Sequence, residues 1–399
     1  MTILLSDNII SSLGFTAEEN YRNVKRGECG LKFFPDHYDI PEPFMASEID
    51  GKRLEEAFGK VVAERSLPAG DRSSSNGSHP VAGANYTKLE KASIVSVAEA
   101  LKNTGIDPAD KRVLFVLSTT KGNIFLLDEN EREGYEHDRI FLWRSAELIA
   151  GFFGNPNQPV VISNACISGA SAMIAAQREL RSGRYDYAIV TGADVLSKFI
   201  VSGFQSFKAL SQEVCKPFDA NRTGLNIGEA AATVILAERC GNEPNNGDIV
   251  LTAGAVRNDA NHISGPSRTG EGSYLALRHV LKGIDPDEVA FVSAHGTATP
   301  YNDEMESVAL TRAGLQNVPV NSLKGYFGHT LGAAGVLESV ISTRALKEGV
   351  ILETYGFETP GVTCPIHVVK KTQSTTKRRF IKMLSGFGGC NVAVLYTKY

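Results

Sequence analysis

The chain has 399 residues, 42% of them hydrophobic and 22% charged, which is enough to bury a larger core than one domain of usual size needs. Its 41 basic and 45 acidic residues give a formal charge of −4, so no global field favours nucleic acid or an anionic membrane as a partner. Its six cysteines are scattered without a CxxC pair, which favours a reducing cytoplasm over the class of secreted, disulfide-rich proteins.

The first predicted elements indicate a layered α/β architecture. A short apolar run at residues 3–5 predicts a strand, and the polar residues that follow exclude a signal peptide or a membrane span there. A helix is expected after Thr16, which can cap it, with Glu18 and Glu19 in its first turn. Helical periodicity returns at residues 88–101. Residues 112–118 form a nearly continuous apolar run, as in a central strand covered on both faces.

The next unit carries a candidate nucleophile. Residues 160–162 are β-branched and apolar, and a polar turn leads from them into a small-residue helix that reaches Leu180. Cys166 stands at this turn, where the N–H groups and the dipole of the helix N-terminus favour thiolate over thiol. The alternative is that Cys166 is a small buried hydrophobe, as most free cysteines are. Another buried strand is expected at residues 187–191.

The second half of the chain repeats this plan. Residues 319–323 predict a strand, residues 324–329 a glycine-containing turn, and residues 331–346 a helix. Cys166 lies at the first of these turns and His329 at the second, so two similar halves packed face to face would bring the two side chains together. The alternative is that any α/β protein contains several such units.

A second histidine also follows a predicted strand. Residues 289–294 are apolar and β-prone, and His295 comes next, among small and hydroxyl residues, where open α/β sheets bind ligands. Cys166 with His295 and His329 forms the set that nucleophilic catalysis requires, a nucleophile with groups that manage protons. Metal binding is the competing use, but Cys166, His295 and His329 do not fall at zinc-like spacings from one another, so we expect no metal there.

Five sequence blocks then resemble one family, and together they span nearly the whole chain. They are NACISGASA around Cys166, PFDANRTGLNIGEAAA at 217–232, AHGTATPYNDEMES at 294–307, NSLKGYFGHTLGAAG at 321–335 and SGFGGCNV at 385–392. In this order they resemble the elongating β-ketoacyl-acyl carrier protein synthases. The resemblance implies a thiolase-like α/β fold, with two duplicated halves in an αβαβα arrangement. We expect the N-terminal half to span residues 1–240 and the C-terminal half residues 241–399.

The resemblance also implies a reaction, a decarboxylative Claisen condensation of an acyl group with malonyl-acyl carrier protein. Cys166 would accept the acyl group, while His295 and His329 would drive malonyl decarboxylation and stabilise the enolate. The backbone amides of Cys166 and Phe387 would form the oxyanion hole, and Phe387 would also close the acyl pocket as a gate. Phe204 would line that pocket; the alternative is that it is an ordinary core residue.

The remaining matched residues support the substrate or the carrier. Lys324 and Glu338 match a charged pair that orders the active site, and Thr297 and Thr299 match hydroxyls that hold the phosphopantetheine arm. Ser264 is placed with the substrate-binding residues, and Lys208 is the expected contact with acyl carrier protein. No bound cofactor is expected, because the substrates arrive on the phosphopantetheine arm of the carrier.

Several positions depart from the family pattern without removing a catalytic group: Ile167 after the nucleophile, Ala230 and Ala231 after Glu229, Tyr326 and Phe327 before Gly328, and Cys390 after the glycine loop. They leave open whether the pathway makes fatty acids or a specialised polyene, polyketide or lipid. The alternatives are a priming synthase or thiolase-type enzyme, and a non-catalytic partner subunit resembling a chain-length factor. The subunit arrangement is expected to be a homodimer or a heterodimer with a related synthase.

Overall fold

Ten strands form the central sheet of the protein. The computed structural model describes residues 1–40, 42–66, 85–239 and 244–399. The order of strands in the sheet is β11-β10-β14-β15-β9-β1-β8-β6-β4-β5. The N-terminal half contributes β1 (Thr2–Ser11), β4 (Val113–Ser118), β5 (Val160–Ile162), β6 (Tyr187–Asp194) and β8 (Ala230–Glu238). The C-terminal half contributes β9 (Ile249–Asn258), β10 (Val289–Ser293), β11 (Val320–Asn321), β14 (Arg379–Gly386) and β15 (Cys390–Lys398).

The two sets of strands follow one topology, which confirms the predicted duplication. When the five strands of each half are numbered in chain order, their order from the outer edge of the sheet to its middle is third, second, fourth, fifth, first in both halves. The pairing directions match as well, because β4 and β10 each have two parallel neighbours and the fourth strand of each set runs antiparallel to the fifth. The first strands, β1 and β9, meet at the pair Ile3–Val250. The predicted boundary at residue 240 lies outside the described residues and stays a prediction.

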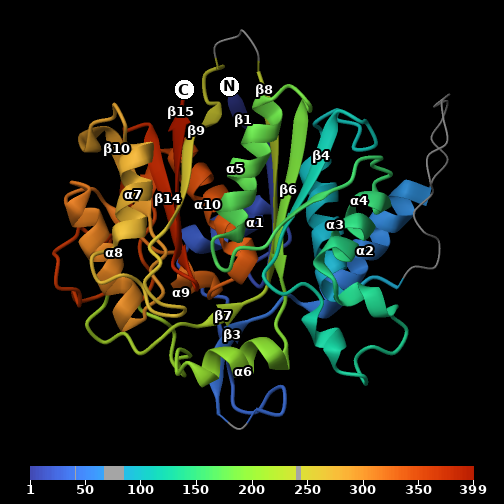
Figure 1. Cartoon of the computed structure of the whole chain (residues 1–399), viewed down its shortest axis with the longest axis horizontal. Helices are drawn as coiled ribbons and strands as arrows, with labels where there is room; N and C mark the ends of the chain where they lie inside the picture. The colour runs from blue at the N-terminus through green and yellow to red at the C-terminus, as the bar shows by residue number, and fades with distance from the viewer. Residues whose placement is uncertain (41, 67–84, 240–243) are drawn as a thin grey trace.

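Helices cover both outer faces and fill the space between the halves, so the layers run αβαβα (Figure 1). One outer layer contains α2 (Gly51–Ser66), α3 (Lys88–Leu101) and α4 (Leu142–Phe152). The other contains α7 (Glu271–Val280) and α8 (Pro300–Arg312). Between the two halves of the sheet lie α1 (Ala17–Lys25), α5 (Ser168–Arg181) and α10 (Ala334–Glu348).

The shorter elements lie around this frame. A small sheet contains β2 (Lys32–Phe34), β3 (Phe44–Ser47) and β7 (Ile227–Gly228), and β12 (Val350–Ile351) pairs with β13 (Gln373–Ser374). The short helices are α6 (Lys198–Ser206), α9 (Lys324–Phe327) and the 3-10 turns at Ile124–Leu127, His137–Ile140, Pro286–Glu288 and Leu331–Ala333. Among the described residues, no helix is long and apolar enough to cross a membrane.

Most predicted elements form where the residue pattern placed them. Thr16 caps α1 through the Glu19 amide, and Thr87 and Glu90 form a capping box at the start of α3. All six residues of β4 are buried, as expected for a strand covered on both faces. One prediction was wrong in detail: the turn expected at residues 324–329 contains the helix α9, because its apolar aromatic residues are buried rather than solvated.

Helices α5 and α10 approach each other at two glycines, and this contact decides where the site forms. A Cβ atom on Gly335 would lie 2.3 Å from the backbone nitrogen of Ala170, and one on Gly169 would lie 2.9 Å from that of Val336. Real Cβ atoms do not approach so closely, so the close crossing requires glycine at both positions. The crossing holds the N-terminal ends of the two central helices side by side, one from each half of the chain.

Candidate active site

Cys166 lies on a tight turn between β5 and α5. Ala165, just before it, has a left-handed backbone with φ of 45°, a conformation that costs a non-glycine residue about 1–3 kcal/mol. Ser168 secures the turn, because its hydroxyl donates to the Ala165 carbonyl at 2.6 Å and accepts from the Asn164 amide at 2.8 Å. The Cys166 side chain is therefore held in one place at the N-terminal end of α5, where it is buried.

Burial of Cys166 opposes the thiolate that the helix N-terminus favours. Burial raises the pKa of the Cys166 thiol from 9.0 to about 12, although Lys324 and the Phe387 amide act in the opposite direction. This rise in the pKa is worth about 4 kcal/mol. A helix N-terminus contributes at most about 2 kcal/mol in favour of the anion, so burial outweighs it. The Phe387 amide lies close enough to the sulfur to lower its pKa, which is the placement that an oxyanion hole shared with the Cys166 amide needs.

The structure brings Cys166, His295 and His329 together, as the duplicated halves predict. The Cys166 sulfur and one ring nitrogen of each histidine all lie within 4.8 Å of one another, and all three residues are buried. The two imidazole rings are 5.0 Å apart between centroids and nearly perpendicular, at 83°. This closeness arises although the three residues are far apart in the sequence and come from different loops of the fold.

Both histidines are neutral. Burial lowers their pKa values well below 6.5, and the positive charge of Lys324 lowers them further. In His329, Nδ1 accepts a hydrogen bond from the Leu331 amide at 3.1 Å, which places the ring proton on Nε2. That Nε2 atom is buried and has no partner among the described residues. It is therefore a hydrogen-bond donor that is free to bind a substrate oxygen.

Two acidic residues that the sequence reasoning missed hold the His295 loop. Glu306 accepts hydrogen bonds from the amides of His295 at 2.7 Å and Gly296 at 2.6 Å. Asp303 accepts from the Thr297 amide at 2.9 Å. Both acids are fully buried in the first turns of α8, just after the loop. Their position within the AHGTATPYNDEMES block was the signal that could have identified them.

A third missed acid holds the loop that follows His329. Asp194, at the buried end of β6, accepts from the Gly332 amide at 2.7 Å. It also accepts from the Thr119 hydroxyl at 2.8 Å and the Thr120 amide at 2.9 Å. One carboxylate thus joins the loop after β4, in the N-terminal half, to the loop that carries His329. A charged residue at the end of an apolar strand was the signal in the sequence.

Lys324 and Glu338 form the expected buried ion pair. Lys324 begins α9 and Glu338 lies in α10, so the pair joins the two elements on either side of His329. The sequence reasoning did not include Lys382 on β14, whose ammonium contacts the other carboxylate oxygen of Glu338. One buried carboxylate is therefore shared by two lysines.

A cavity of about 1090 Å³ leads from the surface to these side chains. Phe387 packs against Phe204 and Phe207 at its wall, with ring centroids 6.0 and 5.2 Å apart. The hydroxyls of Thr297 and Thr299 are 2.8 Å apart. The predicted site residues that line it are Cys166, Phe204, Lys208, Ser264, His295, Thr297, Thr299, His329 and Phe387. Lys324 and Glu338 are not in this lining and are buried, and the charge of Lys324 acts on both histidines.

Each reactive side chain lies near a backbone position that is strained. Ala165 precedes Cys166, Ala298 follows His295 with φ of 60°, and Leu331 follows His329 with φ of 51°. Non-glycine residues adopt these angles when the surrounding structure fixes them, and such positions cluster at functional sites. The three loops are thus held in set conformations rather than left to adapt.

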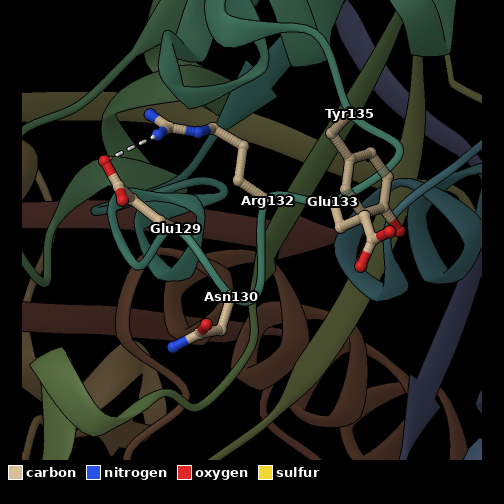
Figure 2. A pocket seen from close by; sticks show the side chains of 5 residues that line it. All are labelled: Glu129, Asn130, Arg132, Glu133 and Tyr135. Atoms are coloured by element: carbon tan, nitrogen blue, oxygen red, sulfur yellow. Dashed lines mark hydrogen bonds and ion pairs between the residues drawn. The ribbon is translucent and has the colours of Figure 1, made fainter.

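A second depression, of about 590 Å³, lies elsewhere on the surface (Figure 2). It is formed by the exposed loop between two 3-10 turns, where Arg132 contacts Glu129 at 3.5 Å. It shares no lining residue with the Cys166 cavity and contains neither a thiol nor an imidazole. The Cys166 cavity is therefore the candidate active site. The side chains that line the second depression are those of Glu129, Asn130, Arg132, Glu133 and Tyr135.

Comparisons with known proteins match both halves of the chain to one family. Residues 8–240 match the family description "Beta-ketoacyl synthase, N-terminal domain", and residues 249–358 match "Beta-ketoacyl synthase, C-terminal domain". A Schizosaccharomyces pombe protein, provisionally named a mitochondrial 3-oxoacyl-acyl-carrier-protein synthase, is 28% identical over 98% of this chain and 97% of its own length. A protein of Streptomyces cyaneus, provisionally named a polyketide beta-ketoacyl synthase, is 30% identical over 71% of each chain.

Solved structures agree on the fold. A ketosynthase in complex with its chain length factor from Xenorhabdus doucetiae superimposes with a TM-score of 0.84, covering 100% of this chain and 98% of that one at 23% identity. That likeness confirms the thiolase-like fold. Together with the matches that span both halves of the sequence, it leads to one conclusion. The chain belongs to the β-ketoacyl synthase family, whose members are condensing enzymes of the acyltransferase type.

Proposed function

We propose that this β-ketoacyl synthase elongates an acyl group held on Cys166 with two carbons from malonyl-acyl carrier protein. The observation that carries the proposal is the placement of a buried thiol beside two neutral histidines at the base of an open cavity. A nucleophile is needed to hold the acyl group, and neutral donors are needed to stabilise an enolate without protonating it.

The acyl group is loaded first. The Cys166 sulfur attacks the thioester carbonyl, and the oxyanion that forms is held by the backbone amides of Cys166 and Phe387. The carbon–sulfur bond to the phosphopantetheine breaks, and the thiol proton passes to the departing sulfur. Since the Cys166 pKa is raised to about 12, this proton leaves as the thioester reacts rather than beforehand.

Malonyl thioester then enters the same cavity. Its carboxylate leaves as carbon dioxide, and the electron pair moves into an enolate whose oxygen accepts hydrogen bonds from His295 and His329. The enolate carbon attacks the acyl-Cys166 carbonyl, the carbon–sulfur bond to Cys166 breaks, and the β-ketoacyl product leaves on the carrier. The Cys166 thiolate regains a proton from solvent. In this scheme, Lys324 and Glu338 hold the elements on either side of His329.

The mouth of the cavity supports acyl carrier protein as the partner. Lys208 and Arg268 are exposed at its rim, and they give a local positive charge that suits an acidic carrier although the whole chain is net negative. Thr297 and Thr299 offer hydroxyls to the phosphopantetheine arm further in, and Ser264 lies on the same lining. No protein-bound cofactor is part of the proposal.

An exposed edge supports a dimer. β5 is the last strand of the sheet and is only partly buried, and an unpaired edge of this kind can pair with a second chain. The neighbouring start of α4 exposes Phe141 and Trp143, whose rings stack at 6.2 Å and 11°. The partner is a second copy or a related subunit. The Xenorhabdus doucetiae ketosynthase is seen with a chain length factor, which favours testing both.

The compartment we propose is the cytoplasm. The cysteines of the described residues are all free, as a reducing compartment requires. The Schizosaccharomyces pombe relative is named as mitochondrial, and the mitochondrial matrix is a reducing compartment as well. Whether the acyl chain is of the fatty-acid or the polyketide type is decided by which carrier-bound substrates load Cys166.

Measuring the mass of the intact protein after incubation with acyl-carrier proteins of different chain lengths tests the proposal. An elongating synthase takes acyl groups from the carrier. A priming or thiolase-type enzyme takes them from acyl-coenzyme A in preference, and a chain-length-factor-like subunit takes none. Capture of an acyl group from carrier protein, followed by β-ketoacyl product when malonyl-carrier protein is added, is the expected result. Absence of any adduct from any carrier contradicts it.

A further inference from the structure

Lys382 is a lysine buried entirely inside the protein. It lies on β14 in register with Ser293 of β10, and its side chain has no exposed surface. The ammonium group donates to the backbone carbonyls of Ser293 at 3.1 Å and Ala294 at 3.0 Å, and to the Ser293 hydroxyl at 3.3 Å. Its fourth contact is the Glu338 carboxylate. Ala294 directly precedes His295, so Lys382 binds the backbone at the end of β10, immediately before that histidine.

The carboxylate that Lys382 contacts already has another partner. Lys324 already pairs with Glu338, so Lys382 adds a second ammonium to a carboxylate that has a partner. Burying a charged group costs several kcal/mol unless its contacts offset the lost hydration, and lysine is almost never fully buried without a specific pairing. A methionine would fill the same space on β14 without that cost. Glu306 on α8 also faces this ammonium, so what singles out Lys382 is its place: it binds the carbonyl directly before His295, and its charge acts on both imidazoles.

We propose that Lys382 is a positioning residue of the decarboxylation step, one that ties the end of β10 and hence His295 to the Lys324–Glu338 pair and supplies positive charge near the two imidazoles. This inference rests on the proposed function. The lysine is not among the residues that line the Cys166 cavity. Its charge favours the neutral imidazole over the imidazolium and stabilises the negative charge that develops on the enolate oxygen.

The pKa shifts of the two histidines agree with this role of Lys382. Burial, and then Lys324, lower the pKa of His295, and Lys382 lowers it further, while Lys324 and Lys382 act likewise on the pKa of His329. Burial lowers the pKa of Lys382 itself from 10.5 to about 8, against the opposing effect of Glu338. The ammonium is thus mostly charged at neutral pH and loses its charge above about pH 8. The ionisable groups that face it are Glu338 on α10, Lys324 on α9, Glu306 on α8 and the two imidazoles.

The test measures carbon dioxide release from malonyl-carrier protein in a Cys166→Gln background, which removes acyl transfer. With Lys382 present, the rate should fall above about pH 8. Lys382→Met should lower the rate at neutral pH by about tenfold or more and remove that alkaline fall, because no ammonium remains to titrate. Lys382→Arg, which keeps its charge at all these pH values, should recover most of the rate and keep it above pH 8.

Two controls separate positioning from folding. Lys398→Met removes an ammonium that also binds backbone carbonyls, those of Leu346 and Lys347, and it should leave the rate and the pH profile unchanged. Lys382→Met with Cys166 intact should still load an acyl group, since loading does not use the histidine pair.

Three outcomes would overturn the inference: a rate for Lys382→Met within about twofold of its parent, a lowered rate whose pH profile keeps the same alkaline fall, or no recovery by Lys382→Arg in a protein that still loads acyl groups. No carbon dioxide release by Cys166→Gln with Lys382 intact would instead contradict the proposed function itself.

Discussion

Removing the His329 imidazole should slow decarboxylation about a hundredfold. In Cys166→Gln, a neutral side-chain carbonyl occupies the place of an acyl-cysteine carbonyl, so the histidines face a site that resembles the loaded enzyme. His329 Nε2 carries the ring proton, is buried and has no other partner among the described residues, so the whole strength of its hydrogen bond is available to the enolate oxygen. Loss of such a donor costs about 3 kcal/mol, which corresponds to about a hundredfold in rate.

The assay follows labelled carbon dioxide from carboxyl-labelled malonyl-carrier protein, with Cys166→Gln compared with the double variant that adds His329→Ala. His329→Gln is the matched control, because its amide nitrogen can reach close to the position of Nε2 and should recover part of the rate. The KM for malonyl-carrier protein should change little, since the bond strengthens mainly in the transition state. If the double variant releases carbon dioxide as fast as Cys166→Gln alone, His329 is structural and the two-histidine mechanism is wrong for this protein.

Three further results are expected. Lys208→Glu should raise the apparent KM for carrier-bound substrates and leave small thioester mimics little affected, whereas Lys282→Glu, at an exposed position beyond α7, should change neither; an equal loss with both kinds of substrate would point to folding instead. Gly335→Ala should lower the free energy of unfolding by about 1–3 kcal/mol, because its Cβ meets the Ala170 backbone, while Gly151→Ala in α4, with open space around it, should not; chemical denaturation decides. Treatment with a metal chelator should leave condensation unchanged, because Cys166 and the two histidines are assigned to catalysis, and loss of activity restored by zinc would show a metal site.

The fold could be predicted because its signals are local and repeated. Apolar strand patterns, a helix cap at Thr16 and two strand–turn–helix units fix the elements, and the duplication then places Cys166 opposite His329. The resemblance of motifs named the reactive side chains, and the structure gathers them within one cavity. Features that depend on residue type and on order along the chain were therefore accessible from the sequence.

The groups that hold the site in place were not accessible in the same way. Asp194 meets the backbone of a loop in the other half of the chain, so that partner exists only once the halves have packed. Asp303, Glu306 and Lys382 meet backbone within the C-terminal half, at a loop and a strand end whose conformation depends on the packing. The effect of burial on the Cys166 thiol was missed for a related reason. Its position at a helix end is visible in the sequence, but the extent of its burial depends on the whole tertiary structure.

The central claim is that Cys166 alone carries the acyl group that the condensation consumes. The most direct measurement digests the protein after acyl loading, locates the acyl group by mass, and then adds malonyl-carrier protein to a second loaded sample. We expect the group on the Cys166 peptide alone, its loss upon malonyl addition with one carbon dioxide and one β-ketoacyl product per acyl group, and no loading of Cys166→Ala. An acyl group that persists on Cys166→Ala, or one found on Cys390 and turned over from there, would contradict the account.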